Sequence, residues 1–212
     1  GESFVFAWDR IKSDPATILG TFIGGGFVSS IVSLCGQLIL RIDPQNIAFQ
    51  SIGMLAFFLN FAISTFMWAG ITLFGLKVAR GEPYEFTDIF RGGRYFLPML
   101  LAFLISSVGV LLGVLLLIVP GVILSLGWTL TVPLIVDKNL GVFAAFKESW
   151  RLMKGQKLSF FLWSLATAGL VVLGLMACCV GVLVVTSAFN IAHNFIYLRI
   201  TGQRTAELST AA

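Results

Sequence analysis

The chain has 212 residues, of which 58% are hydrophobic and only 11% are charged. A soluble domain of this length needs a larger charged fraction to cover its surface, so the composition excludes an ordinary soluble protein and predicts a polytopic membrane protein. The net charge of +4 comes from basic residues beside apolar stretches, which indicates anionic lipid headgroups as partners and excludes nucleic acid.

The first segment, about residues 3–12, is amphipathic. Phe4, Val5, Trp8 and Ile11 fall on one helical face, which predicts a helix lying in the membrane interface. This segment lacks the basic tip and apolar core of a secretory signal peptide. We therefore expect the first long apolar run to act as an uncleaved membrane signal.

Asp14-Pro15 predicts a helix start, with Asp14 as N-cap and Pro15 as the first helical residue. The helix that follows has one side made of small residues, on which we expect close helix packing. These residues are Gly20, Gly24, Gly25, Gly26, Ser29, Ser30 and Ser33.

Six stretches are apolar and long enough to cross a bilayer, because about 20 helical residues cross a hydrocarbon core of about 30 Å. We expect these spans at about 16–40, 51–76, 96–118, 121–137, 158–178 and 181–199. Two more amphipathic interfacial helices are expected at about 85–91 and 140–154. The predicted fold is an all-α, polytopic helical membrane protein with a single transmembrane domain over residues 1–212.

From Tyr95 to Val136 the chain carries no charged residue, and this interval fits two crossings joined by a tight turn. Pro120-Gly121 is the strongest helix breaker within it, so we expect the turn there. Pro133 is expected to kink the second arm. A re-entrant loop is the alternative for this interval.

The plan of a short amphipathic helix followed by a hairpin recurs along the chain. The last hairpin fills residues 158–198, with its turn expected near Cys179 to Gly181. With residues 85–91 as a weaker middle copy, we expect three such repeats. The two matching segments are Phe4, Trp8, Ile11, Lys12 and Phe146, Trp150, Met153, Lys154.

The basic residues predict the orientation in the membrane. If the N-terminus is cytoplasmic, every one of the 14 Lys and Arg residues except Arg41 lies on the cytoplasmic side. Such a bias is typical of the positive-inside rule. Both termini are therefore expected in the cytoplasm.

The last span carries the clearest candidate site, a polar stripe at three- and four-residue steps. Its members are Thr186, Asn190, His193, Asn194 and Tyr197. One interpretation is hydrogen bonding between helices, with Asn60, Ser64 or Thr129 as partners. The other is a small-molecule pocket, or a haem or pigment ligand through His193.

Basic residues of the amphipathic segments are candidate lipid headgroup contacts. They are Arg91, Arg94, Lys147, Arg151 and Lys154. Arg91-Gly92-Gly93-Arg94 has the arginines and glycines that suit a lipid phosphate. The alternative is that these arginines only anchor a span at the interface.

Residues that carry chemistry are scarce. No charged residue is expected inside the bilayer core, and metal-ligand clusters, catalytic triads and phosphate loops are absent from the sequence. The three cysteines, Cys35, Cys178 and Cys179, are interpreted as apolar packing residues. We therefore expect no enzyme activity, no cofactor and no metal.

Several motifs together resemble the membrane domain attached to some bacterial glycerophosphoryl diester phosphodiesterases, and related stand-alone bacterial membrane proteins. The resemblance covers about residues 70–200 and implies a bacterial inner-membrane location. In that family the phosphodiesterase activity belongs to a separate soluble barrel, so no catalytic residue is carried over. The motifs are Lys77-Val-Ala-Arg-Gly81-Glu82, Phe86, Asp88-Ile-Phe90, Leu117-Ile-Val-Pro120-Gly121, Trp128, Pro133-Leu-Ile-Val136, Ala145, Ser149-Trp-Arg-Leu152 and Gly155.

Two functional hypotheses follow. The first is a non-enzymatic scaffold or accessory subunit of a membrane complex, or a lipid-organising protein, with other membrane subunits or further copies of itself as partners. The second is a transporter or flippase for a lipid or small amphiphile, in which the polar stripe lines the path and the Pro120 and Pro133 breaks move.

Overall fold

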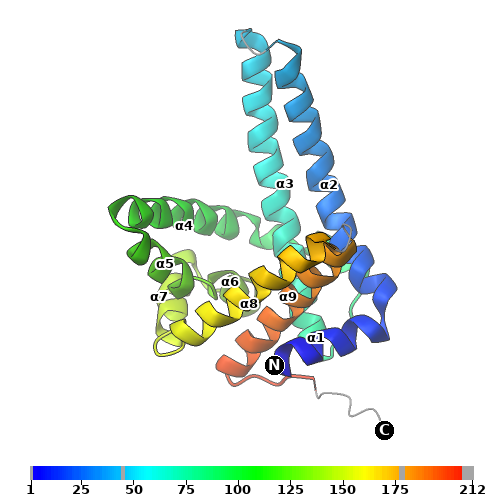
Figure 1. Ribbon diagram of the computed structural model, residues 1–212, viewed down its shortest axis with the longest axis vertical. Helices are drawn as coiled ribbons and strands as arrows, with labels where there is room; N and C mark the ends of the chain where they lie inside the picture. Colours follow the sequence, from blue (N-terminus) through cyan, green and yellow to red (C-terminus); the bar gives the residue numbers. More distant parts are fainter. Residues whose placement is uncertain (1, 44–45, 177–179, 207–212) are drawn as a thin grey trace.

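The computed structural model describes residues 2–43, 46–176 and 180–206, which form helices and contain no strand (Figure 1). The elements are α1 (Glu2–Ser13), α2 (Pro15–Ile42), α3 (Ile47–Arg80), the 3₁₀ helix η1 (Phe86–Tyr95), α4 (Phe96–Leu116), α5 (Ile118–Gly127), α6 (Thr131–Lys138), α7 (Val142–Leu152), α8 (Lys157–Met176) and α9 (Val180–Ile200).

Six helical stretches in the described residues are long and apolar enough to cross a membrane. They are Pro15–Cys35, Ile47–Arg80, Phe86–Leu116, Ile118–Lys138, Lys157–Leu175 and Gly181–Ile200. The prediction of an all-α, polytopic helical membrane protein is therefore confirmed. Helices α1, η1 and α7 stand at the three predicted amphipathic segments, and each precedes a pair of long apolar stretches.

The ends of the first long helices follow from local residues. The Asp14 carboxylate accepts a hydrogen bond from the Thr17 backbone N–H at 3.2 Å, and Pro15 is the first residue of α2. This start matches the prediction. At the end of α3, Gly81 adopts a left-handed conformation with φ of 72°, which glycine reaches without steric cost.

The turn after α4 lies earlier than the sequence predicted. Leu117 is extended, with φ of −169° and ψ of 144°, while Pro120 and Gly121 belong to the first turn of α5. Proline is tolerated there because the first helical N–H groups have no acceptor within the helix. Gly121 instead allows close packing, since a Cβ on Gly113 of α4 would lie 2.9 Å from its Cα.

The second arm of this hairpin is broken into α5 and α6. The break covers residues 128–130, and Pro133 is the third residue of α6, so the chain bends just before the proline that was expected to bend it. A turn was also predicted near Cys179 to Gly181. Cys179 lies outside the described residues, and Val180 and Gly181 are the first residues of α9.

The six spans do not form one parallel bundle. Helices α2 and α3 pair along their length as an arm that rises from the body, whereas α4 extends to one side (Figure 1). All buried residues of α3 other than Gly53 fall between Thr65 and Ala79. Elements other than α2 therefore contact α3 only in its second half.

Helix α9 is the most buried of the six apolar stretches and packs on α1, α3 and α8. The buried face of α1 matches the predicted apolar face only in part. Phe6 and Ala7 are buried, and the Phe6 ring stacks on Phe195 with a centroid distance of 4.4 Å, while Val5 and Trp8 are exposed. Of the predicted apolar face, Ile11 is buried and Phe4 packs partly buried against the core, so only Val5 and Trp8 point outward.

The 3₁₀ helix η1 packs on α3 backbone against backbone. A Cβ on Gly70 of α3 would lie 1.8 Å from the Ile89 carbonyl oxygen, and one on Gly92 would lie 2.4 Å from the Gly70 nitrogen. Two glycines facing each other let the chains approach this closely. Gly92, expected beside a lipid phosphate, is therefore occupied in packing.

Candidate functional site

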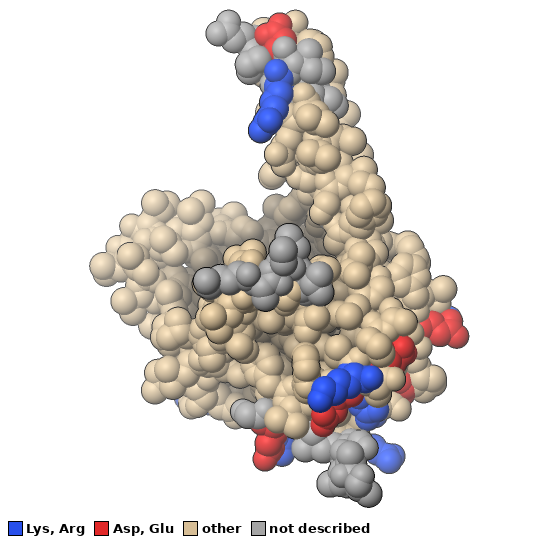
Figure 2. All heavy atoms as spheres, turned by 45° about the vertical axis from the view of Figure 1, so that its right-hand side comes forward, with Lys and Arg blue, Asp and Glu red and all other residues tan. Residues whose placement is uncertain are grey.

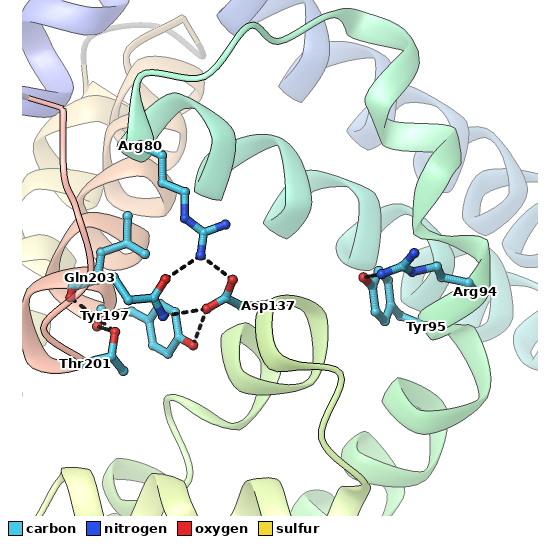
Figure 3. Close-up of polar contacts among 8 residues, drawn as sticks. Arg80, Arg94, Tyr95, Asp137, Tyr197, Thr201 and Gln203 are labelled. Atoms are coloured by element: carbon cyan, nitrogen blue, oxygen red, sulfur yellow. Dashed lines mark hydrogen bonds and ion pairs between the residues drawn. The ribbon is translucent and has the colours of Figure 1, made fainter.

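Four polar side chains join the ends of α3, α6 and α9, and we call them the charged cluster: Arg80, Asp137, Tyr197 and Gln203 (Figure 3). The Arg80 guanidinium forms an ion pair with Asp137 and donates to the Gln203 side-chain oxygen at 2.6 Å. The Tyr197 hydroxyl and the Gln203 amide both donate to the second Asp137 oxygen, each at 2.7 Å.

The Asp137 side chain is only 7% exposed. A carboxylate this buried is stable in its charged form only when its oxygens are hydrogen-bonded and a cation lies beside it. Both oxygens of Asp137 have partners, drawn from α3, α9 and the segment after α9. The charged cluster therefore ties together the ends of α3, α6 and α9, which are far apart in sequence.

A second ion pair fixes η1 to the same end of α3. The Asp88 carboxylate lies 2.8 Å from Lys77 Nζ and 3.1 Å from an Arg91 guanidinium nitrogen. Its other oxygen accepts the Glu85 backbone N–H at 2.9 Å. The last turn of α3 thus pairs with two buried aspartates from two different elements.

A cavity of about 340 Å³ lies between α3, α4, the break from α5 to α6, and α9. On α9 its lining residues precede Tyr197 of the charged cluster. We call it the polar pocket. Its aromatic lining residues are Trp68, Phe103, Trp128 and Phe189. Its polar lining residues are Thr72, Ser106, Ser125, Thr129, Thr131, Asn190, His193 and Asn194.

Three lining residues of the polar pocket carry buried polar atoms without a hydrogen-bond partner among the described residues. These atoms are Thr131 Oγ1, His193 Nε2 and Asn194 Oδ1. The Asn194 amide nitrogen donates to the backbone and side-chain oxygens of Asn190, both at 3.0 Å, which leaves the oxygen as its unpaired end. Such atoms are rare in proteins and are normally satisfied by water or a ligand.

The structure divides the predicted polar stripe. Asn190 and Asn194 pack against Gly75 of α3, and His193 lies among the rings of Phe160, Trp163 and Phe189. Asn190, His193 and Asn194 all line the polar pocket, so this part of the stripe does come together.

The two ends of the stripe are elsewhere. Tyr197 belongs to the charged cluster, and Thr186 is exposed, with its hydroxyl donating to the Val182 carbonyl of its own helix at 2.9 Å. The stripe is one face of α9, but that face meets different elements at different heights. It is therefore not a single surface.

Of the three expected partners of the stripe, Thr129 lines the polar pocket. Asn60 lies in the outer half of α3, lines a separate cavity of about 240 Å³ against α2, and accepts from Ser64 at 3.5 Å. Asn190 meets α3 at Gly75, about four helical turns from Asn60 and about three from Ser64, so neither residue is its partner.

The five predicted headgroup residues, Arg91, Arg94, Lys147, Arg151 and Lys154, are all exposed, on η1, α7 and the turn after α7. Several also have protein partners. The Arg94 guanidinium stacks on the neighbouring Tyr95 ring at 4.5 Å. Arg151 forms an ion pair with Glu148 at 2.6 Å, and its hydrogen bonds lower the pKa of Glu148.

Sequence reasoning missed Arg80, Asp137 and Gln203 as members of one cluster. In the sequence, Asp137 stands out only as the residue that ends the charge-free interval from Tyr95 to Val136. A single acidic residue closing a charge-free interval was the available signal, because a carboxylate at the edge of the membrane needs a cation nearby. Which cation it meets was not readable.

Cysteines and acidic residues do not assemble into a metal site in the part of the chain that the structure describes, where no three His, Cys, Asp or Glu side chains come close enough. Cys35 is exposed and free, so the packing role expected for it is wrong. Cys178 and Cys179 lie outside the described residues.

No protein-family model matches the chain, and no solved structure matches it. The chain is 35% identical over 80 residues to the presequence translocated-associated motor subunit PAM17, mitochondrial, of two strains of Cryptococcus neoformans var. neoformans serotype D. This match covers 36% of the chain and spans about a third of the fungal proteins, 35% of their length.

A longer match is to Mycobacterium tuberculosis, in a protein named only as uncharacterized protein Rv2560. The identity is 27% over 228 aligned positions, which cover 98% of this chain and 70% of the mycobacterial protein. The chain is thus similar along nearly its whole length to a bacterial protein and over a short stretch to a mitochondrial motor subunit.

Proposed function

We propose that this chain is a non-enzymatic integral membrane protein that serves as a scaffold or accessory subunit of a membrane complex. The observation that carries the proposal is the α2–α3 arm. Between Ile47 and Ser64 every residue of α3 except Gly53 is at least partly exposed. The arm therefore offers a long apolar surface to lipid and to another membrane protein.

The length of α3 supports the same role. Its 34 residues measure about 50 Å, which exceeds a hydrocarbon core of about 30 Å. The surplus leaves room for tilt and for packing against a partner. The name of the fungal relative describes a motor subunit, which also favours a subunit role for this chain.

We further propose a bacterial inner-membrane location, with both termini in the cytoplasm and anionic lipid headgroups at the five exposed basic residues. Charged side chains gather around the lower body in Figure 2, far from the arm tip that carries Arg41. The resemblance to the phosphodiesterase membrane domain remains part of this proposal, and Rv2560 is a bacterial protein that is similar over 98% of this chain.

Site-specific photo-crosslinking in the native membrane tests the subunit role. A crosslinking amino acid replaces Leu55, which is 69% exposed on the arm, and as a control Leu165, which is 59% exposed on α8. We expect Leu55 to give discrete adducts with one or a few proteins and Leu165 to give mainly lipid adducts. Lipid adducts alone at both positions, with a chain that purifies free of partners, contradict the proposal.

The polar pocket favours a second candidate function, a transporter or flippase for a lipid or small amphiphile. Flux in proteoliposomes tests it. Asn190→Leu and His193→Leu, which change the pocket, should abolish flux, whereas Thr186→Leu, outside the pocket, should not. Unchanged flux in the pocket variants removes transport.

A further inference from the structure

We propose that the polar pocket binds the head group of an uncharged, hydroxyl-bearing amphiphile, such as a lipid with a free alcohol. This site goes beyond the accessory role. For the transport candidate it names the substrate class, and in that respect alone it rests on the proposed function.

The position and size of the pocket fit a lipid head group. Its volume of about 340 Å³ lies at the lower end of known ligand pockets. Helix α4 packs on α3, α5 and α6 but barely on α9, and both α4 and α9 line the pocket. Within this proposal, the acyl chain leaves between α4 and α9 towards the apolar surroundings while the head group stays inside.

The charges around the pocket select an uncharged head group. Among the residues that the structure describes, no Lys, Arg, Asp or Glu lines it. The charged cluster lies at the opposite end of α6, where Arg80 and Asp137 neutralise each other. An ionic head group in the pocket would be buried without a counter-ion, which is costly.

The unpaired polar atoms select a hydrogen-bonding group that both donates and accepts. Thr131 is 1% exposed and Asn194 is 2% exposed, so bulk water does not reach them. Asn194 Oδ1 needs a donor, and the Thr131 hydroxyl can donate or accept. A ligand hydroxyl can donate to Asn194 Oδ1 or accept from the Thr131 hydroxyl, and both residues line the pocket.

Aromatic side chains form the apolar walls that such a ligand needs. Trp68, Phe103, Trp128 and Phe189 line the pocket, and Gly109 of α4 lets the Trp128 ring approach, since a Cβ there would lie 2.6 Å from it. Uncharged polar atoms on α6 and α9 beside aromatic walls match an amphiphile better than water alone.

Photolabelling of the purified full-length chain tests the site. The probe is a diacylglycerol with a diazirine near its glycerol end, and the comparison is a phosphatidylglycerol with the same chains and diazirine. We expect saturable labelling of α4 and α9 peptides by diacylglycerol, competed by unlabelled diacylglycerol, and at least about tenfold weaker labelling by the anionic probe, because an unpaired charge is penalised in the pocket.

Three variants locate the binding. Val110→Trp fills the pocket and should abolish the labelling, whereas Leu111→Trp, its exposed neighbour on α4, should keep it. Thr131→Val keeps the shape and removes one hydroxyl. It should weaken competition by diacylglycerol about threefold to tenfold, as expected for one hydrogen bond, without lowering Tm.

Three outcomes overturn the inference. One is equal labelling by both probes, another is labelling that persists in Val110→Trp, and the third is no saturable labelling, which would leave water as the occupant. Saturable labelling together with absent flux removes only the transport candidate and leaves the binding site in place.

Discussion

At the scale of single residues, we expect the Asp137 carboxylate to stabilise this fold more than an exposed ion pair does. Asp137 receives hydrogen bonds from Arg80, Tyr197 and Gln203. Arg80 ends α3, whereas Tyr197 and Gln203 lie at the end of α9 and just after it. Loss of Asp137 removes the shared acceptor of a guanidinium, a hydroxyl and an amide, and leaves the guanidinium only its bond to Gln203. Most exposed ion pairs contribute far less, since water screens them.

Asp137→Ala should therefore destabilise the protein strongly. Removing one partner of a buried pair typically costs about 3–5 kcal/mol, and the partly exposed Arg80 argues for the lower part of that range. The measurement is Tm in detergent, with Arg80→Ala and the double variant completing the cycle. Glu148→Ala, which breaks an exposed pair, is the control and should change Tm little. An equal loss of Tm in Asp137→Ala and Glu148→Ala would contradict the role given to Asp137.

At the scale of elements, glycines decide how closely the helices approach. The predicted small-residue side of α2 is used for packing only in part. Gly24 faces Phe86 and Gly25 faces Ile71, whereas Gly20 and Gly26 have open space beside them. The closest approach lies instead between Gly70 and η1, which the sequence did not indicate, because it depends on where η1 folds back.

Gly70→Ala should displace η1 from α3. The added Cβ would meet the Ile89 carbonyl oxygen at 1.8 Å, and backbone cannot move away as a side chain does. We expect a large loss of Tm and faster proteolysis between α3 and α4. Gly26→Ala is the matched control, since its Cβ meets nothing within 4 Å.

In that control, alanine should leave stability unchanged or raise it by up to about 1 kcal/mol, because it favours the helix. Normal behaviour of Gly70→Ala in both measurements would show that η1 does not depend on this close contact.

At the scale of the whole molecule, polar contacts join the helical hairpins at one end, whereas the outer apolar halves of the hairpins lie apart. The charged cluster and the pair of Lys77 with Asp88 lie at the end of α3 that is remote from the arm tip. The outer halves of α2, α3 and α4 carry mainly apolar surface. Lipid or a membrane partner is the natural cover for these surfaces.

The expected orientation makes a direct prediction. In a variant without native cysteines, Arg41→Cys should react with a membrane-impermeant maleimide in intact cells, and Lys154→Cys should react only after the membrane is permeabilised. Both positions are exposed, so access to the reagent depends on the side of the membrane. Labelling of Lys154→Cys in intact cells would contradict the predicted orientation.

The sequence by itself determined that this is a helical membrane protein, where its apolar stretches run and where Asp14 starts a helix. Those features depend on local hydrophobicity and capping, which neighbouring residues set. It also pointed to Asn190, His193 and Asn194, because polar residues at helical spacing inside an apolar run are visible without a fold.

Only the tertiary structure decided what these residues meet. Tyr197 lies on the same face as Asn194, yet it binds Asp137 while Asn194 lines the polar pocket. Apolar residues occupy most positions along such helices, so hydrophobicity alone does not select their neighbours. Close glycine contacts and a few buried polar pairs select them instead, and both depend on residues far apart in the chain.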